Sequence, residues 1–127
     1  MSKHKSVTSI DISSPEGLNR NRIGLKGSKA LKKLIKTNEI LTILNVEGNS
    51  LGPDGFLNVV RGLEHNRSLL SLNLNGNDLG PESFEIIMNA LHKSNVIELG
   101  MANNKLGTAG CESIHNVLSN ELGICRL

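Results

Sequence analysis

A short pattern of leucine, asparagine and glycine recurs along the chain at a nearly constant period, and it constrains the fold more than any other feature. The pattern reads L-x-x-L-x-L-x-x-N-x-L-G, and its copies begin at Leu41, Leu69 and Val96, so they are almost evenly spaced. Self-similarity at such a period is typical of repeat proteins, in which each copy forms one structural unit that stacks on the next. We therefore expect a solenoid.

A further copy at the start of the chain, counted here as the first, is interrupted. Residues 7–12 supply its leading half, whereas its turn half, residues 21–24, lies one full period before the matching segment 49–52. The two halves are further apart than in the other copies, and we interpret residues 13–20 as a loop insertion. The chain is thus expected to be a single domain, with repeats at about 7–40, 41–68, 69–95 and 96–123 and a truncated fifth strand at 124–127.

Each unit is predicted to contain a strand followed by a helix. In the second copy Leu44 and Val46 point to one side of the strand and Asn45 to the other, because side chains alternate along a strand. The stretches that begin at Phe56 and Phe84 have apolar residues at the helical spacing i, i+3, i+4, i+7. Stacking such units predicts an α/β leucine-rich solenoid: a short horseshoe of about four repeats, with parallel strands on the concave face and helices on the convex face.

These residues resemble leucine-rich repeats of the ribonuclease-inhibitor subtype, and the resemblance covers about residues 7–127. A weaker similarity, one repeat wide, links Leu44–Asn49, Gly55 and Asn66–Leu69 to the C-terminal repeat domain of tropomodulins. Members of the family inhibit ribonucleases, activate the Ran GTPase, cap actin pointed ends or sense ligands in innate-immune receptors. The resemblance implies a non-catalytic protein–protein interaction module, with a GTPase-activator-like or actin-capping-like regulatory fragment as an alternative.

Two residue types recur once per repeat, and both are interpreted as structural. The asparagines are expected to satisfy backbone groups of neighbouring turns as a ladder, since buried polar groups are normally hydrogen-bonded. The glycines occur singly, whereas a phosphate-binding loop needs several in one turn, so we expect them to adopt unusual backbone angles. The two columns are Asn21, Asn49, Asn77 and Asn104, and Gly24, Gly52, Gly80 and Gly107.

Nothing in the sequence predicts catalysis, a metal site or a cofactor. Two cysteines, Cys111 and Cys125, and the histidines His65, His92 and His115 have no ligand spacing such as C-x2-C or H-x3-H. A serine–histidine–aspartate order with its nucleophile elbow is also absent. The sequence has neither a membrane-spanning apolar run nor a secretory leader, and its low cysteine content favours a reducing compartment. We expect a cytoplasmic protein that is not an enzyme.

The outward strand positions form the first candidate binding surface, on the expected concave face. This face is small, polar and mildly acidic, and it lacks the Trp, Tyr and Arg residues that anchor tight interfaces. We expect it to bind another protein with modest affinity, or to bind a basic segment. The candidate contact residues are Asp11, Ile43, Asn45, Glu47, Ser71, Asn73, Asn75 and Glu98.

The first helix offers a second surface. Residues 1–36 carry nine Lys/Arg and two Asp/Glu, a charge of +7, whereas residues 37–127 carry five and ten, a charge of −5. The residues of this helix expected to face the core are Ala30, Leu31, Leu34 and Ile35. The lysines expected to face solvent are Lys26, Lys29, Lys32, Lys33 and Lys36. They predict either a contact with an anionic surface or a merely solvated face. Nucleic acid is disfavoured, because no aromatic residue lies nearby to stack on bases.

The last repeat has no polar cap, which solenoids usually need to cover their final core layer. After a final predicted helix the chain stops within a strand, at Leu127. We expect either a longer repeat array or an end that a partner or a second copy covers. Self-association through residues 111–127 would be the consequence of the second alternative.

Overall fold

The computed structural model of the chain describes residues 7–13 and 23–107. Strands of three residues alternate with helices along these ranges. The strands are β1 (Ser9–Asp11), β2 (Ile43–Asn45), β3 (Ser71–Asn73) and β4 (Glu98–Gly100), and the helices are α1 (Gly24–Thr37), α2 (Gly52–Leu63) and α3 (Ser83–Leu91). Several sequence predictions fall outside the described residues: the fifth strand at 124–127, the terminal segment 111–127, most of the insertion 13–20, and the residues Asn21, Cys111, His115 and Cys125.

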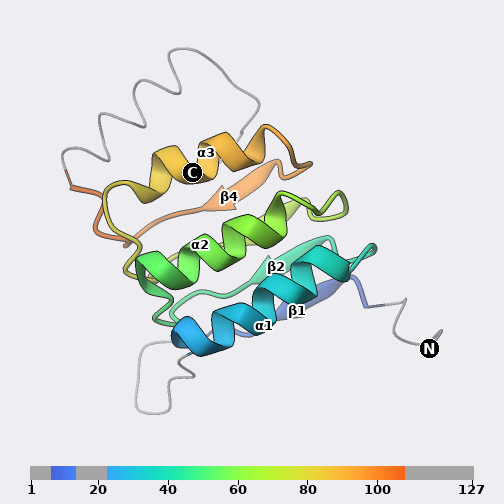
Figure 1. The fold of residues 1–127 in the computed structure, drawn as a ribbon, viewed down its shortest axis with the longest axis horizontal. Coiled ribbons are helices and arrows are strands. Elements are labelled where there is room, and N and C mark those ends of the chain that lie inside the picture. Colours follow the sequence, from blue (N-terminus) through green and yellow to red (C-terminus); the bar gives the residue numbers. More distant parts are fainter. Residues whose placement is uncertain (1–6, 14–22, 108–127) are drawn as a thin grey trace.

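The strands form one parallel sheet in the order β1-β2-β3-β4. Leu44 pairs with Ile10 on one side and with Leu72 on the other, and Leu72 pairs in turn with Leu99. The interval along the chain from Ile10 to Leu44 is longer than the interval from Leu44 to Leu72, which agrees with the extra length predicted for the first repeat. Figure 1 shows the helices side by side over one face of this sheet, so the predicted α/β arrangement is confirmed.

Aliphatic layers fill the space between the helices and the sheet. Leu44, Leu72 and Leu99, at the centres of neighbouring strands, are each 1% exposed. Phe56 and Phe84, which begin the apolar faces of α2 and α3, are 1% and 0% exposed. Because each repeat places the same kind of side chain at the same height, every layer packs on an equivalent layer of its neighbour. No helix in the described ranges is long and apolar enough to cross a membrane.

The turn between each strand and its helix explains the glycine column. Gly24, Gly52, Gly80 and Gly107 have φ angles of +62°, +68°, +88° and +63°. No neighbouring group lies within 4 Å of the place where a Cβ would stand on any of them. The left-handed backbone angle, and not a shortage of space, therefore favours glycine at these turns, and the predicted unusual angles are confirmed.

The asparagine column forms a buried ladder beside these turns. Asn77 is fully buried, and its amide nitrogen donates to the carbonyls of Val46 and Leu74, each at 3.1 Å. Its Oδ1 accepts from the backbone N–H of Asn49 in the preceding repeat at 2.9 Å. One repeat later, the Oδ1 of Asn104 accepts from the N–H of Asn77 at 2.7 Å. The structural interpretation is confirmed for these three asparagines.

A second pair of asparagines, absent from the repeat template, organises the loops that return from helix to strand. Asn66 is 2% exposed, and its Oδ1 accepts from the backbone N–H groups of Ser68 and Leu69. Its amide nitrogen donates to the carbonyls of Ile35 and Asn38 in the preceding repeat. Asn38 accepts the same two local bonds in its own loop. The placement of Asn38 and Asn66 one full repeat apart is the sequence signal that marks this pair.

The first helix contradicts one prediction. Leu31 and Ile35 are buried as expected, but Ala30 is exposed. Ala30 aligns with Asn58 of α2, whose amide nitrogen reaches back to a serine hydroxyl of α1 at 2.9 Å. This helix position therefore faces the preceding helix. Within the described ranges no helix precedes α1, so Ala30 has nothing to pack against and is wrong as a core residue.

Candidate functional site

The sheet brings the eight candidate contact residues onto one surface, which we call the sheet face. Asp11, Asn45 and Asn73 lie in one row across β1, β2 and β3. Ile43, Ser71 and Glu98 lie in a second row across β2, β3 and β4. Glu47 and Asn75 follow the first row by two positions in their own repeats. Because the intervening leucines point into the core, both rows face away from the helices.

The first row of the sheet face is engaged in local hydrogen bonds where the strands end. A side-chain oxygen of Asp11 accepts from the N–H of Ser13 at 2.9 Å. Asn45 and Asn73 make the equivalent bonds to the N–H groups two positions ahead, at 3.0 and 2.9 Å. Such side-chain bonds replace backbone bonds and end a strand in a turn. These positions are therefore less available to a partner than their outward direction alone suggests.

The fourth strand has no side chain in this row, and a neighbour compensates. The Oδ1 of Asn75 crosses from the preceding repeat and accepts from the N–H of Ala102 at 2.8 Å. A Cβ on Gly100 would stand 2.8 Å from that oxygen and 2.9 Å from the Oδ1 of Asn73. Gly100 therefore leaves room for two asparagine side chains. Glycine is required here because a Cβ would be crowded, whereas the turn glycines are required because of their backbone angles.

The charge of the sheet face is negative. The Oε1 atom of Glu47 accepts from the amide nitrogen of Asn73 at 3.2 Å, and Oε1 of Glu98 accepts from the hydroxyl of Ser71 at 3.0 Å. Asp11 supplies a third carboxylate, and no Lys or Arg occupies an outward position of the four described strands. The side chain and the backbone N–H of Ser13 both donate to Asp11, and they lower the pKa of its carboxyl below the usual value near 3.8.

An apolar strip adjoins these carboxylates at the edge where the strands begin. It consists of Ile43, Leu70 and Ile97, which are 46%, 41% and 56% exposed. Leu70 and Ile97 immediately precede β3 and β4 and adjoin one another through the bond from the Ile97 N–H to the Leu70 carbonyl at 2.9 Å. Of these three, strand alternation predicts only Ile43 as an outward residue, because Leu70 and Ile97 lie one position before the outward residues Ser71 and Glu98 of their own strands.

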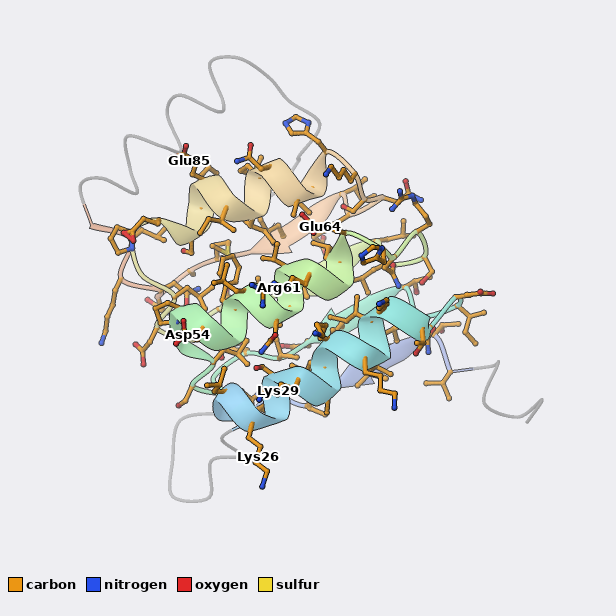
Figure 2. The ribbon with its side chains drawn as sticks, in the orientation of Figure 1. Lys26, Lys29, Asp54, Arg61, Glu64 and Glu85 are labelled. Atoms are coloured by element: carbon orange, nitrogen blue, oxygen red, sulfur yellow. The ribbon has the colours of Figure 1, made fainter. Side chains whose placement is uncertain are left out.

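The helical side of the molecule carries the predicted lysines. Lys26, Lys29, Lys33 and Lys36 are exposed on α1, whereas Lys32 is half-buried. Its backbone explains the difference, because Lys32 lies where α1 passes closest to Gly62 of α2. Figure 2 shows the charged residues Lys26, Lys29, Asp54, Arg61, Glu64 and Glu85 on this side of the molecule.

One shallow pocket of about 340 Å³ lies among the loops that return from α1 and α2 to the sheet. Its lining residues are Lys36, Asn38, Glu39, His65, Arg67 and Ser68. The guanidinium of Arg67 already donates to the carbonyls of Glu64 and Asn66, at 3.4 and 3.2 Å. In the described part of the chain, no three His, Cys, Asp or Glu side chains gather closely enough to hold a metal ion.

Comparison with known proteins identifies the class. Residues 65–83, from the loop before β3 to the start of α3, match the family described as "Leucine Rich repeat". With the repeated strand–helix units of the sheet, this match identifies the fold as that of leucine-rich repeats. The ribonuclease-inhibitor subtype stays a prediction.

One similar solved structure is described as leiomodin-1 actin-binding site 2. The two folds agree with a TM-score of 0.79 over 98% of this chain and 72% of that chain, at 15% sequence identity. At this identity the likeness establishes the fold alone. No curated protein matches the sequence significantly.

Proposed function

We propose that this protein is a non-catalytic interaction module that binds another protein through its sheet face. The observation that carries the proposal is the composition of that face. It presents three carboxylates, from Asp11, Glu47 and Glu98, beside an exposed apolar strip, and it includes no cationic strand residue among those described. The helices cover the opposite side of the sheet, and none of the described helices lies over this face (Figure 1).

The chemistry of the face favours a partner with a basic segment. Complementary charge steers such a segment toward the face and fixes its register. The repeated fold adds support, because stacked units create an extended binding surface. The low cysteine content favours a reducing compartment, and we include a cytoplasmic location in the proposal.

A pair of matched charge reversals tests the proposal. Glu47→Lys changes an exposed residue of the sheet face, and Glu85→Lys makes the same change on an exposed residue of α3. Partners are captured from cell extract with each tagged variant and quantified by mass spectrometry. We expect Glu47→Lys to reduce the specific partner on the order of tenfold and Glu85→Lys to leave it unchanged.

Both variants should keep the unfolding midpoint of the parent protein, which circular dichroism will check. Equal retention of all partners by both variants would show that the sheet face is not the binding surface. Asn45→Arg with Asn73→Arg is a poorer test, because each substitution also removes a hydrogen bond that ends a strand.

A second candidate function rests on the exposed lysines of α1. Lys26, Lys29, Lys33 and Lys36 lie along one helix and suit an anionic surface such as a membrane rich in acidic lipids. Co-sedimentation with phosphatidylserine vesicles at low and high salt tests this directly. Binding that Lys29→Glu and Lys33→Glu abolish would establish it, and no sedimentation at low salt would exclude it.

The regulatory alternatives require their own assays. The similar leiomodin-1 structure is named as an actin-binding site, which makes actin capping the more specific of the two alternatives. Slowed growth of actin pointed ends would support capping, and accelerated GTP hydrolysis by a small GTPase would support an activator. Unchanged rates in both assays would exclude both regulatory activities and leave only the proposed interaction module.

A further inference from the structure

The apolar strip formed by Ile43, Leu70 and Ile97 is a feature that folding does not require. Leu70 and Ile97 occupy a position where the first two repeats carry Thr8 and Thr42. The exposed fractions of the three strip residues lie between 41% and 56%, so the core gains little from them. Single exposed apolar residues are common on protein surfaces, but here Leu70 and Ile97 are neighbours in one row, and Ile43 lies in the next row on the adjoining strand.

Ile43, in the neighbouring row, is likewise a large aliphatic residue where the adjoining repeats have small polar ones. Its partners in the sheet register are Ser9 and Ser71, which are small and polar. The same structural positions are therefore filled by Ser or Thr in some repeats and by large aliphatic residues in others. Because the backbone is equivalent in all of them, the aliphatic residues at 43, 70 and 97 serve the surface.

The spacing of the strip suits a helix that lies across the strands. Neighbouring strands are about 4.8 Å apart, so three of them span about 10 Å. An α-helix advances about 10.5 Å from residue i to residue i+7, with residue i+3 or i+4 near the middle. An extended peptide advances about 13 Å over residues i, i+2 and i+4, which overshoots the strip. Apolar residues at i, i+4 and i+7 of a helix can thus meet the three strip residues in turn.

The charges around the strip give such a helix an orientation. Glu47 lies in the turn two positions beyond β2, so it stands at most about 13 Å from Ile43, against a helix diameter of roughly 10–12 Å. Asp11 ends β1 on the same side. Lys36, His65 and Arg67 line the pocket of the return loops, which precede β2 and β3 in the sequence, together with Glu39. A helix across the strands therefore meets Asp11 and Glu47 on the flank where the strands end, and Glu98 in the row of Ile43.

We propose that the strip and the carboxylates beside it bind an amphipathic helix of a partner protein, with apolar residues at i, i+4 and i+7 and basic residues on the flank that faces Asp11 and Glu47. The proposal rests on the sheet face being the binding surface, and it adds the conformation and chemistry of the segment that binds there. Helices that place apolar anchors into a surface at this spacing are a common recognition mode.

The test uses a synthetic helical peptide of about 16 residues, with leucines at i, i+4 and i+7 and lysines along one flank. A peptide with the leucines replaced by alanines and a peptide with glutamates in place of the lysines serve as controls. Two-dimensional NMR of the whole protein measures the affinity and locates the contact. We expect a dissociation constant on the order of 10–100 μM, with shifts centred on residues 43, 70 and 97, and at least about tenfold weaker binding of either control peptide.

The variant series follows the residues of the neighbouring repeats. Ile43→Ser, Leu70→Thr and Ile97→Thr together introduce the residue types that the chain itself uses at these positions. We expect this triple variant to keep the fold and to bind the peptide at least about tenfold more weakly, because it removes the aliphatic contacts. Glu47→Gln keeps an acceptor for Asn73 and should weaken binding several-fold at low salt but little at high salt.

Two results would overturn the proposal. Equal binding of the parent and triple variant would show that the strip is not the contact. A dimer of the parent protein in sedimentation that the triple variant dissolves would show that a second copy covers the strip, through its α1 with the exposed Leu25 beside Lys26 and Lys29. If the peptide fails while Glu47→Lys still loses the partners captured from extract, the sheet face remains the binding surface and only the helical partner is wrong.

Discussion

Replacing Asn77 by alanine should destabilise the protein more than the same change at Asn49, although both side chains are fully buried asparagines at equivalent positions of neighbouring repeats. The difference lies in the acceptor. The Oδ1 of Asn77 accepts from the backbone N–H groups of Asn49 and Leu51, at 2.9 and 3.3 Å. The Oδ1 of Asn49 has no hydrogen-bond partner among the described residues.

The carbonyls that accept from the Asn77 amide each have a second hydrogen-bond donor. Val46 O also accepts from the amide nitrogen of Asn49, at 2.9 Å, and Leu74 O from that of Asn104, at 2.8 Å. Removing the donor of Asn77 therefore leaves each of these carbonyls with one bond. The buried N–H of Asn49 keeps no such substitute within the hydrogen bonds described.

The magnitude follows from these losses. A buried N–H left without a partner costs about 1–3 kcal/mol, and the longer bond to Leu51 and the small cavity add to it. We expect Asn77→Ala to lower the free energy of unfolding by about 2–4 kcal/mol and Asn49→Ala by about 1–2 kcal/mol. These losses are a large part of the roughly 5–15 kcal/mol that stabilises a typical domain.

Urea unfolding followed by circular dichroism measures both variants under the same conditions. The slope of the free energy against urea should stay that of the parent, because the surface exposed on unfolding is unchanged. Equal destabilisation by the two substitutions, within about 0.5 kcal/mol, would refute the reasoning that the acceptor of the ladder carries the larger share.

Three further substitutions probe the turn, the helix contact and the strand end. Gly80→Ala should cost about 1–2 kcal/mol in urea unfolding, because Gly80 has φ = +88° while space around it is open. Gly62→Ala should cost a net of about 1–2 kcal/mol in the same assay, since its Cβ would stand 2.9 Å from the carbonyl oxygen of Lys32, and this crowding exceeds the gain in helix propensity. Asp11→Asn should be less stable than the parent at neutral pH and equal to it in strong acid. Hydrogen bonds from Ser13 lower the pKa of the Asp11 carboxyl in the folded protein. The stability that the ionised carboxylate contributes is therefore present above the unfolded pKa and is lost as pH falls through the lower folded pKa. Urea unfolding at several pH values measures that difference, and a gap that persists in strong acid would contradict it.

The fold could be predicted because its determinants recur at a fixed period. Leu44, Leu72 and Leu99 occupy one template position, and the sheet pairs them in register. The turn glycines and the asparagine ladder follow from the same alignment, because each repeats a local backbone requirement. Periodicity thus reveals what every repeat needs.

The surface could be predicted only in part. The outward direction of the sheet-face residues follows from strand alternation, but several of their hydrogen bonds cross to a neighbouring repeat. Asn75, for example, crosses to the N–H of Ala102 because Gly100 offers no side chain there. Leu70 and Ile97 were not predicted for a different reason, since they lie one position before the outward row and strand alternation does not assign them to that face.

The positions where repeats differ carry the functional argument. A change from Thr42 to Leu70 at one structural position alters neither the backbone nor the core, because neither side chain belongs to the buried layers. Such a change acts only on what the surface contacts. At the end of the described stack, a difference between repeats has another cause. Ala30 occupies the repeat position of the buried Asn58, but it is exposed because no described helix precedes α1. A difference between repeats therefore points to binding where the neighbouring repeats are present on both sides, as they are for Leu70, and to an altered environment where one of them is not.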